Sequence, residues 1–150
     1  MPFIIENRYI QPAITLLDNL PLSGAFSRAR TRFITQLATH LTALQEAEYA
    51  LVAEHATTNT GEPIIEADGT FTFASPENVN AFCAEHATLL AERALIETEA
   101  YEGHHDLVRQ ALENTDAVFT GVEAVAYDAL LTTLENTAVG GEDGGSAHQA

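Results

Sequence analysis

The chain has 150 residues and a formal net charge of −16, because 22 acidic residues stand against six arginines and there is no lysine. This charge would repel nucleic-acid phosphates and anionic membrane surfaces, so we expect neither as a partner. The absence of lysine excludes Schiff-base and P-loop chemistry, and a single cysteine excludes an internal disulfide framework or a multi-cysteine metal site.

The N-terminal segment predicts short elements. Residues 3–10 predict two very short strands around a turn at Asn7-Arg8, because asparagine tolerates the left-handed backbone conformation that such a turn needs. Pro12 suits the first turn of a short helix. We expect this helix to run to about Leu20, where Pro21 ends it.

A long helix is predicted over residues 26–55. Its apolar side chains step by three or four positions, which is the period of a buried helical face. They are Phe26, Ala29, Phe33, Leu37, Leu41, Leu44 and Leu51. Thirty helical residues span about 45 Å, so we expect a second helix to pack antiparallel to this one.

The period changes after the long helix. Asp68-Gly69 is a strong signal for a two-residue hairpin turn, because both turn positions need positive φ. In that register Ile64 faces Phe73 and Glu66 faces Phe71. A lone hairpin is marginal in water, so we expect it to pack on the helices or on the N-terminal strands.

A second long helix is predicted to begin at Ser75-Pro76-Glu77, which supplies an N-cap hydroxyl, a proline at the first helical position and an acid facing the helix dipole. Its apolar face carries Val79, Phe82, Cys83, His86, Leu89, Leu90 and Ile96. The alternating pattern of Leu95–Tyr101 fits a continuation of this helix or an edge strand equally well.

The C-terminal part predicts two more helices, over residues 105–114 and from a capping box at Thr120–Glu123 to about Leu134. Residues 138–150 contain four glycines and predict a disordered, acidic tail. The fold class that results is α+β and predominantly helical, with two long antiparallel helices, short helices and one or two small β-hairpins. We expect a single domain over residues 1–137.

The arginines are concentrated near the start of the chain. Residues 1–33 carry a net charge of +2 and residues 34–150 a net charge of −18. Arg28, Arg30 and Arg32 lie within five residues at the start of the first long helix. Two interpretations remain open: they pair with carboxylates of the same domain, or they form a docking patch for an acidic partner or a phosphate.

The residues that could carry chemistry do not form a recognisable catalytic pattern. The densest group of candidates comprises Glu99, Glu102, His104, His105 and Asp106. Glu102 and His105 have the spacing of a carboxylate-bridged metal site, but Gly103 makes a helix doubtful and no second Glu-x-x-His is present. We therefore expect a surface loop, no specific metal site, no cofactor and no enzymatic activity.

The remaining histidines and the cysteine predict ordinary roles. Cys83 and His86 lie one helical turn apart, and we expect both to pack in the core. His40 and His55 lie at the margins of the first long helix and carry no prediction of a site. The segment Ala53–Thr57 recurs as Ala84–Thr88, which we interpret as a coincidence because nothing on either side repeats.

Several motifs resemble a known family. They are Ser27-Arg28-Ala29-Arg30 followed by Arg32-Phe33, the preceding Leu20-Pro21-Leu22, and the C-terminal block from Gly121 to Tyr127-Asp128. Together with the order of the predicted elements, they resemble small proteins of siphophages and prophages of Gram-positive bacteria, the family called domain of unknown function 1617. The resemblance covers about residues 3–136. It implies a phage gene product of the tail or late-gene region and carries over no activity.

These observations predict a non-enzymatic, phage-encoded interaction protein that is associated with the virion or tail or accessory to assembly. Its expected partner is a phage structural protein, a host protein or a second copy of the chain. No stretch approaches a membrane span, so we expect it in the cytoplasm of the infected cell or in the virion. The alternative function is an acidic mimic of nucleic acid that inhibits a host defence or DNA-processing protein.

Overall fold

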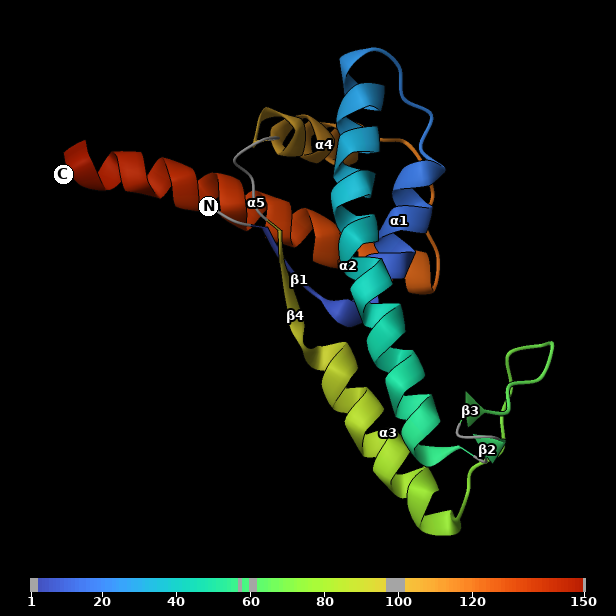
Figure 1. The fold of residues 1–150 in the computed structure, drawn as a ribbon. Coiled ribbons are helices and arrows are strands. Elements are labelled where there is room, and N and C mark those ends of the chain that lie inside the picture. The colour runs from blue at the N-terminus through green and yellow to red at the C-terminus, as the bar shows by residue number, and fades with distance from the viewer. Residues whose placement is uncertain (1–2, 57, 60–61, 97–101, 150) are drawn as a thin grey trace. The chain divides into compact units, whose positions relative to one another are not determined.

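The computed structural model is mostly helical and contains short antiparallel strands (Figure 1), which confirms the predicted α+β, predominantly helical class. It describes residues 3–56, 58–59, 62–96 and 102–149, without the side chains of residues 58–59, 62, 102 and 137–149. The elements are β1 Phe3–Glu6, a 3₁₀ turn Asn7–Tyr9, α1 Ile10–Asp18, α2 Ala25–His55, β2 Thr58–Asn59, β3 Glu62–Pro63, α3 Pro76–Ala91, β4 Arg93–Ile96, α4 Glu102–Asn114 and α5 Val122–Gln149.

The chain divides into two compact units. Unit 1 consists of Met1–Leu41 with Arg93–Ala150, and unit 2 consists of Thr42–Glu92. Helix α2 begins in unit 1 and ends in unit 2. The expectation of a single domain over residues 1–137 stays a prediction.

The sheet of unit 1 joins segments that are far apart in the sequence. β1 pairs antiparallel with β4, with Phe3 opposite Ile96 and Glu6 opposite Arg93. Side chains alternate between buried and exposed along both strands, as a half-buried ladder requires. The predicted N-terminal hairpin is therefore wrong: a 3₁₀ turn follows β1 and leads into α1, and the partner strand comes from the other half of the chain.

The same pairing decides part of the ambiguity that the sequence leaves over Leu95–Tyr101. Leu95 and Ile96 belong to β4 and are strand, and residues 97–101 lie outside the described residues. Glu92 has φ −63° and ψ 150° and so leaves the helical conformation directly after α3. The backbone is therefore already extended when the chain enters β4.

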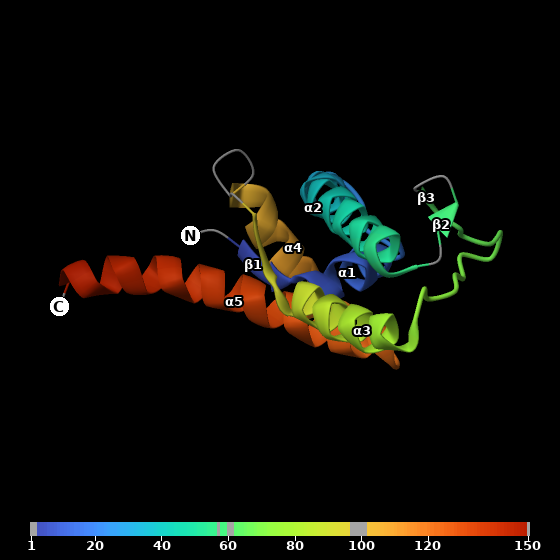
Figure 2. The ribbon, with the colours of Figure 1, turned by 60° about the horizontal axis from the view of Figure 1, so that its bottom comes forward.

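The core of unit 1 lies where α1, the first part of α2, α4 and α5 meet the β1–β4 ladder. α5 contacts α1, α4 and β1 and passes along all three (Figure 2). Ala13, Leu16 and Leu17 of α1 and Leu20, which follows the helix, are buried in this core. On α2 the predicted positions Ala29, Phe33 and Leu37 are fully buried, whereas Phe26 is exposed.

Unit 2 contains the second part of α2, the β2–β3 pair, a turn at Asp68-Gly69 and α3 (Figure 1). The turn is present, but its predicted register is wrong by one residue. Ile65 is opposite Phe71, the Glu66 N–H donates to Thr70 O, and the Gly69 N–H donates to Glu66 O. Gly69 has φ +87°. A three-residue loop with a glycine in the left-handed region explains this register.

Helix α3 begins as the sequence predicts and ends at Ala91, five residues before Ile96, the last position of its predicted apolar face. The Ser75 hydroxyl accepts the Asn78 N–H and caps the helix, and Pro76 is its first residue. α3 has 16 residues and α2 has 31, so the expectation of two long antiparallel helices is wrong in its second member. α3 contains no buried residue, and Cys83 is exposed rather than packed in a core.

The two predicted C-terminal helices are present, but α4 begins three residues earlier than predicted and α5 extends beyond Leu134. Val108, Ala111 and Leu112 of α4 are buried, as are Leu130 and Leu134 of α5. α5 extends to Gln149, but the side chains of its glycine-rich end lie outside the described residues, and the predicted disordered tail over residues 138–150 stays a prediction. Within the described part of the chain, no helix combines the length and apolar character of a membrane span.

Candidate functional site

The three arginines of the predicted docking patch have different environments in unit 1. The Arg30 guanidinium donates to the carbonyl oxygens of Leu20 and of Leu17, the latter at 3.5 Å, and to Ser27 Oγ at 3.3 Å. A cation at the end of α1 satisfies carbonyls that have no partner within the helix and interacts favourably with the helix dipole. Arg30 therefore links α1 to α2 through backbone carbonyls rather than through a carboxylate.

The other two arginines of the predicted docking patch are Arg28 and Arg32. Arg28 is exposed and Arg32 is half-buried. A docking patch would have to rely on these two side chains, because Arg30 is used inside the unit. Their role in docking stays a prediction.

The predicted loop around His104 and His105 is helical. α4 begins at Glu102, so Gly103 does not prevent the helix, and the expectation of a surface loop is wrong. Asp106 is exposed and accepts a hydrogen bond from Arg109 at 2.5 Å, whereas His105 is buried. These two candidates therefore have different environments, and Glu99 and the side chain of Glu102 lie outside the described residues.

His105 belongs to the core of unit 1. Its ring lies 4.6 Å from that of Phe33 and 6.1 Å from that of Phe3, and the two phenyl rings meet edge to face at 5.1 Å. His105 Nε2 lies 2.7 Å from Gln36 Oε1 and donates to it. Nδ1 is buried and has no hydrogen-bond partner among the described residues. Burial, with a smaller contribution from neighbouring His104, lowers the pKa of His105 to about 4.

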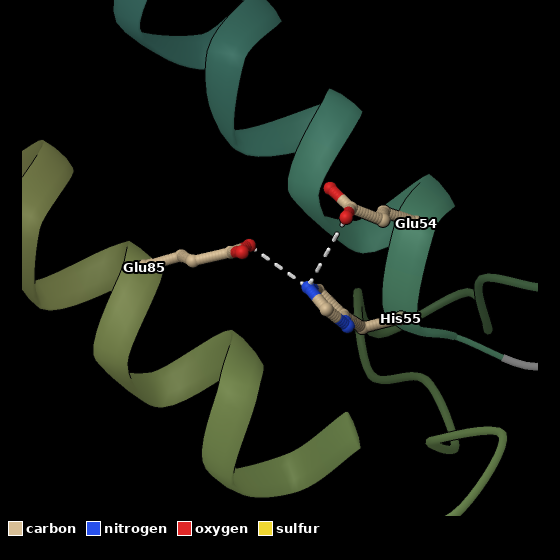
Figure 3. Close-up of side chains that lie close together, drawn as sticks. All are labelled: Glu54, His55 and Glu85. Atoms are coloured by element: carbon tan, nitrogen blue, oxygen red, sulfur yellow. Dashed lines mark hydrogen bonds and ion pairs between the residues drawn. The ribbon is translucent and has the colours of Figure 1, made fainter. Parts of the chain in front are cut away.

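The group of residues that sequence reasoning missed lies in unit 2 and is centred on His55 (Figure 3). His55 Nε2 lies 2.8 Å from Glu85 Oε2 on α3 and 4.0 Å from Glu54 Oε1 on its own helix. On the other side of the ring, Nδ1 lies 3.0 Å from the Asn78 side-chain nitrogen. His55 is only 5% exposed, so this imidazole is held between α2 and α3 by groups on both of its nitrogens.

A second histidine makes a similar pair. His86 Nε2 on α3 lies 2.8 Å from Glu48 Oε2 on α2. The His86 ring also stacks on Phe82 at 5.4 Å, and Phe82 in turn contacts Phe71 and Phe73. The expectation that Cys83 and His86 both pack in the core is wrong: Cys83 is exposed, and His86 is half-buried with the carboxylate of Glu48 as its partner.

The repeated segment is the signal that could have identified these residues. Glu54-His55 on α2 and Glu85-His86 on α3 occupy the same places in the two copies of Ala-Glu-His-Ala-Thr. A Glu-His dipeptide on each of two antiparallel helices can supply a carboxylate to the imidazole of the other helix. One such pair is present, between His55 and Glu85, whereas His86 contacts Glu48 rather than Glu54.

All permanent charges of unit 2 are negative. Residues 42–92 contain nine acidic residues and neither lysine nor arginine. The acids are Glu46, Glu48, Glu54, Glu62, Glu66, Asp68, Glu77, Glu85 and Glu92. Histidine is therefore the only side chain in this segment that can pair with a carboxylate as a cation.

The described part of unit 1 contains open hollows. One, of about 530 Å³, is lined by β1 and α5 residues together with Tyr9 and Arg93. Another, of about 420 Å³, is lined by residues from the segments 21–26 and 110–117. Neither lining contains a histidine or a cysteine.

We predict that Arg30→Ala lowers the free energy of unfolding by about 1–3 kcal/mol, because it removes charge-assisted hydrogen bonds to part-buried carbonyls. The measurement is urea denaturation followed by circular dichroism. Arg28→Ala is the matched control, since it removes an exposed arginine from the same helix and should change stability by less than about 0.5 kcal/mol. Equal effects of the two substitutions would contradict the assigned role of Arg30.

We predict that His105 titrates with a midpoint near pH 4 in the folded protein. Because the folded state favours the neutral ring, its contribution to stability is fully present above pH 6.5 and is lost as the pH falls toward 4. The ring C–H resonances, followed by NMR, report the midpoint. In His105→Gln the loss of stability between pH 6.5 and 4 should be smaller than in the wild type, and an unchanged loss would contradict the prediction.

Comparison of the chain with protein-family models, with curated proteins and with solved structures gives no match in any of the three.

Proposed function

We propose that the chain is a non-enzymatic, phage-encoded interaction protein that binds a protein partner through unit 2. The phage origin rests on the resemblance of its motifs to the siphophage and prophage family. Within that setting, a component of the virion or tail, or an accessory to assembly, is the role we favour. The binding function itself rests on the surface of unit 2.

The observation that carries the proposal is the incomplete core of unit 2. The buried side chains of residues 42–92, among those described, are Leu44, His55 and Ala56. α3 presents Val79, Phe82, Cys83, Leu89 and Leu90 and buries none of them. Ile64 and Ile65 are also exposed. Apolar side chains gathered on a small unit without a finished core are typical of a surface that is covered by a partner.

Charge indicates the kind of partner. A second copy of the chain would bring another nine acidic residues against the nine of unit 2, and no lysine or arginine in this segment would offset the repulsion. A basic partner with apolar side chains complements both properties of the surface. We therefore favour a basic phage or host protein over a homo-oligomer.

The apolar stripe of α2 supports the same choice. Ala29, Phe33 and Leu37 are fully buried within unit 1, and Leu44 is buried in unit 2. These side chains are already used inside the molecule, so the stripe offers no continuous seam for a second copy. A strict monomer by light scattering at micromolar concentration is the expected result.

We predict that Val79→Asp abolishes capture of the partner from infected-cell lysate, because it adds a charge to the exposed apolar face of α3. Val79 is 38% exposed, so the free energy of unfolding should change by less than about 0.5 kcal/mol. Partners are identified by mass spectrometry. Asn80→Asp adds the same charge at a neighbouring exposed polar position and should retain capture. Loss of capture in both variants, or in neither, would contradict a role for the α3 face.

The charge of unit 2 also favours a second function. A small unit with nine acids and no basic side chain can imitate the charge field of a nucleic acid and occlude a basic cleft in a host defence or DNA-processing protein. A mimic would depend on charge more than on apolar contact.

A pull-down across a salt series separates the two functions. Capture of a basic nucleic-acid enzyme that is lost by moderate salt, and that survives Val79→Asp, would support mimicry. Co-purification with tail proteins that persists in salt and is lost in Val79→Asp would support the first function.

A further inference from the structure

We propose that Glu54, His55 and Glu85 form a binding site for a divalent transition-metal ion, with Zn²⁺ as the best fit. The ion would join the last turn of α2 to the middle of α3 within unit 2. The proposal rests on the distances between the three side chains, the burial of the imidazole and the charge of the unit.

The three ligand atoms lie at distances that suit one ion. One atom from each residue can be chosen so that all lie within 4.8 Å of one another, and the three side chains converge from two helices (Figure 3). Tetrahedral Zn²⁺ with bonds of about 2.0–2.1 Å requires ligand atoms roughly 3.3 Å apart. The distances from His55 Nε2 to Glu85 and Glu54, 2.8 and 4.0 Å, lie on either side of that value.

The environment of the ring suits a metal ligand. His55 is 95% buried, and Nε2 faces the two carboxylates while Nδ1 faces Asn78. Rotating the Asn78 carboxamide by 180° would present its oxygen to Nδ1, so that the ring donates from Nδ1 and leaves the Nε2 lone pair for an ion. Ser75, which already bonds the Asn78 amide oxygen, can accept from the amide nitrogen in that orientation.

Charge supplies an independent reason. Glu54 and Glu85 bring two negative charges to a ring that carries at most one positive charge. No lysine or arginine occurs in residues 42–92 to neutralise the remainder. A divalent cation would balance both carboxylates within a segment that has no permanent positive charge of its own.

The donor set indicates the class of metal. Imidazole nitrogen suits Zn²⁺ and its neighbours in the first transition row, whereas Mg²⁺ prefers an all-oxygen shell. The side chains of Glu54 and Glu85 are 62% and 45% exposed, which leaves solvent access on the carboxylate side. One water molecule would complete a four-coordinate shell of three protein ligands.

The test is calorimetric titration of the tag-free full chain with ZnCl₂ after treatment with EDTA and dialysis. We expect one Zn²⁺ per chain, and we expect His55→Gln and Glu85→Gln to weaken binding by about tenfold or more. Glu54→Gln should weaken it as well, and because Glu54 is exposed this variant tests the site even where a substitution of buried His55 unfolds the unit.

Glu48→Gln is the matched control. It removes the same charge from the other histidine–glutamate pair between the same two helices and should bind Zn²⁺ like the wild type. The absence of stoichiometric binding, an equal loss in Glu48→Gln, or unchanged binding in Glu54→Gln and Glu85→Gln would overturn the proposal. Displacement of Zn²⁺ by an equimolar amount of Mg²⁺ would overturn the assignment to a transition metal.

Discussion

The packing of Phe33 on Phe3 and His105 is the interaction on which unit 1 depends. The three rings come from α2, β1 and α4, so one contact joins elements whose sequence positions differ by up to about a hundred residues. Edge-to-face contact at these distances adds to the free energy of burial. The cost is a buried imidazole, which is kept neutral by its environment and is tied to α2 by Gln36. Histidine is often a catalytic or metal-binding residue, but His105 packs in the core of unit 1.

Unit 2 has a different constraint, which is the absence of any permanent cation. With nine acids and no lysine or arginine, it joins α2 to α3 through two histidine–glutamate pairs. A half-buried group of phenylalanines packs the segment around Phe71 and Phe73 on Phe82 of α3. The apolar face of α3 is left without a buried side chain. Both proposals follow from this constraint. An uncovered apolar face with negative charge favours a basic partner, and two carboxylates on one buried imidazole favour a divalent ion.

Local signals in the sequence predicted the elements well where the interaction lies within a few residues. The sequence predicts the Ser75 cap, the apolar period of α2 and the start of α5 near Gly121. A helix cap and a helical face depend on neighbours along the chain, so local sequence is enough to predict them. The hairpin register was wrong because a dipeptide such as Asp68-Gly69 is compatible with loops of two or three residues. Among the candidate site residues, the sequence shows the arginine cluster but does not predict the carbonyl partners of Arg30. Those partners depend on how α1 packs against α2.

The fold class, the positions of most helices and the separation of the arginines from the most acidic segment follow from composition and short-range periodicity alone. The pairing of β1 with β4 and the contact of His55 with Glu85, in contrast, become apparent in the folded chain. These interactions join residues that are 30 positions apart (His55 and Glu85) and up to 93 positions apart (Phe3 and Ile96), and no local preference encodes which distant segment becomes the partner. The repeated Glu-His dipeptide is present in the sequence, but the pair of His55 and Glu85 forms only because α2 and α3 lie side by side.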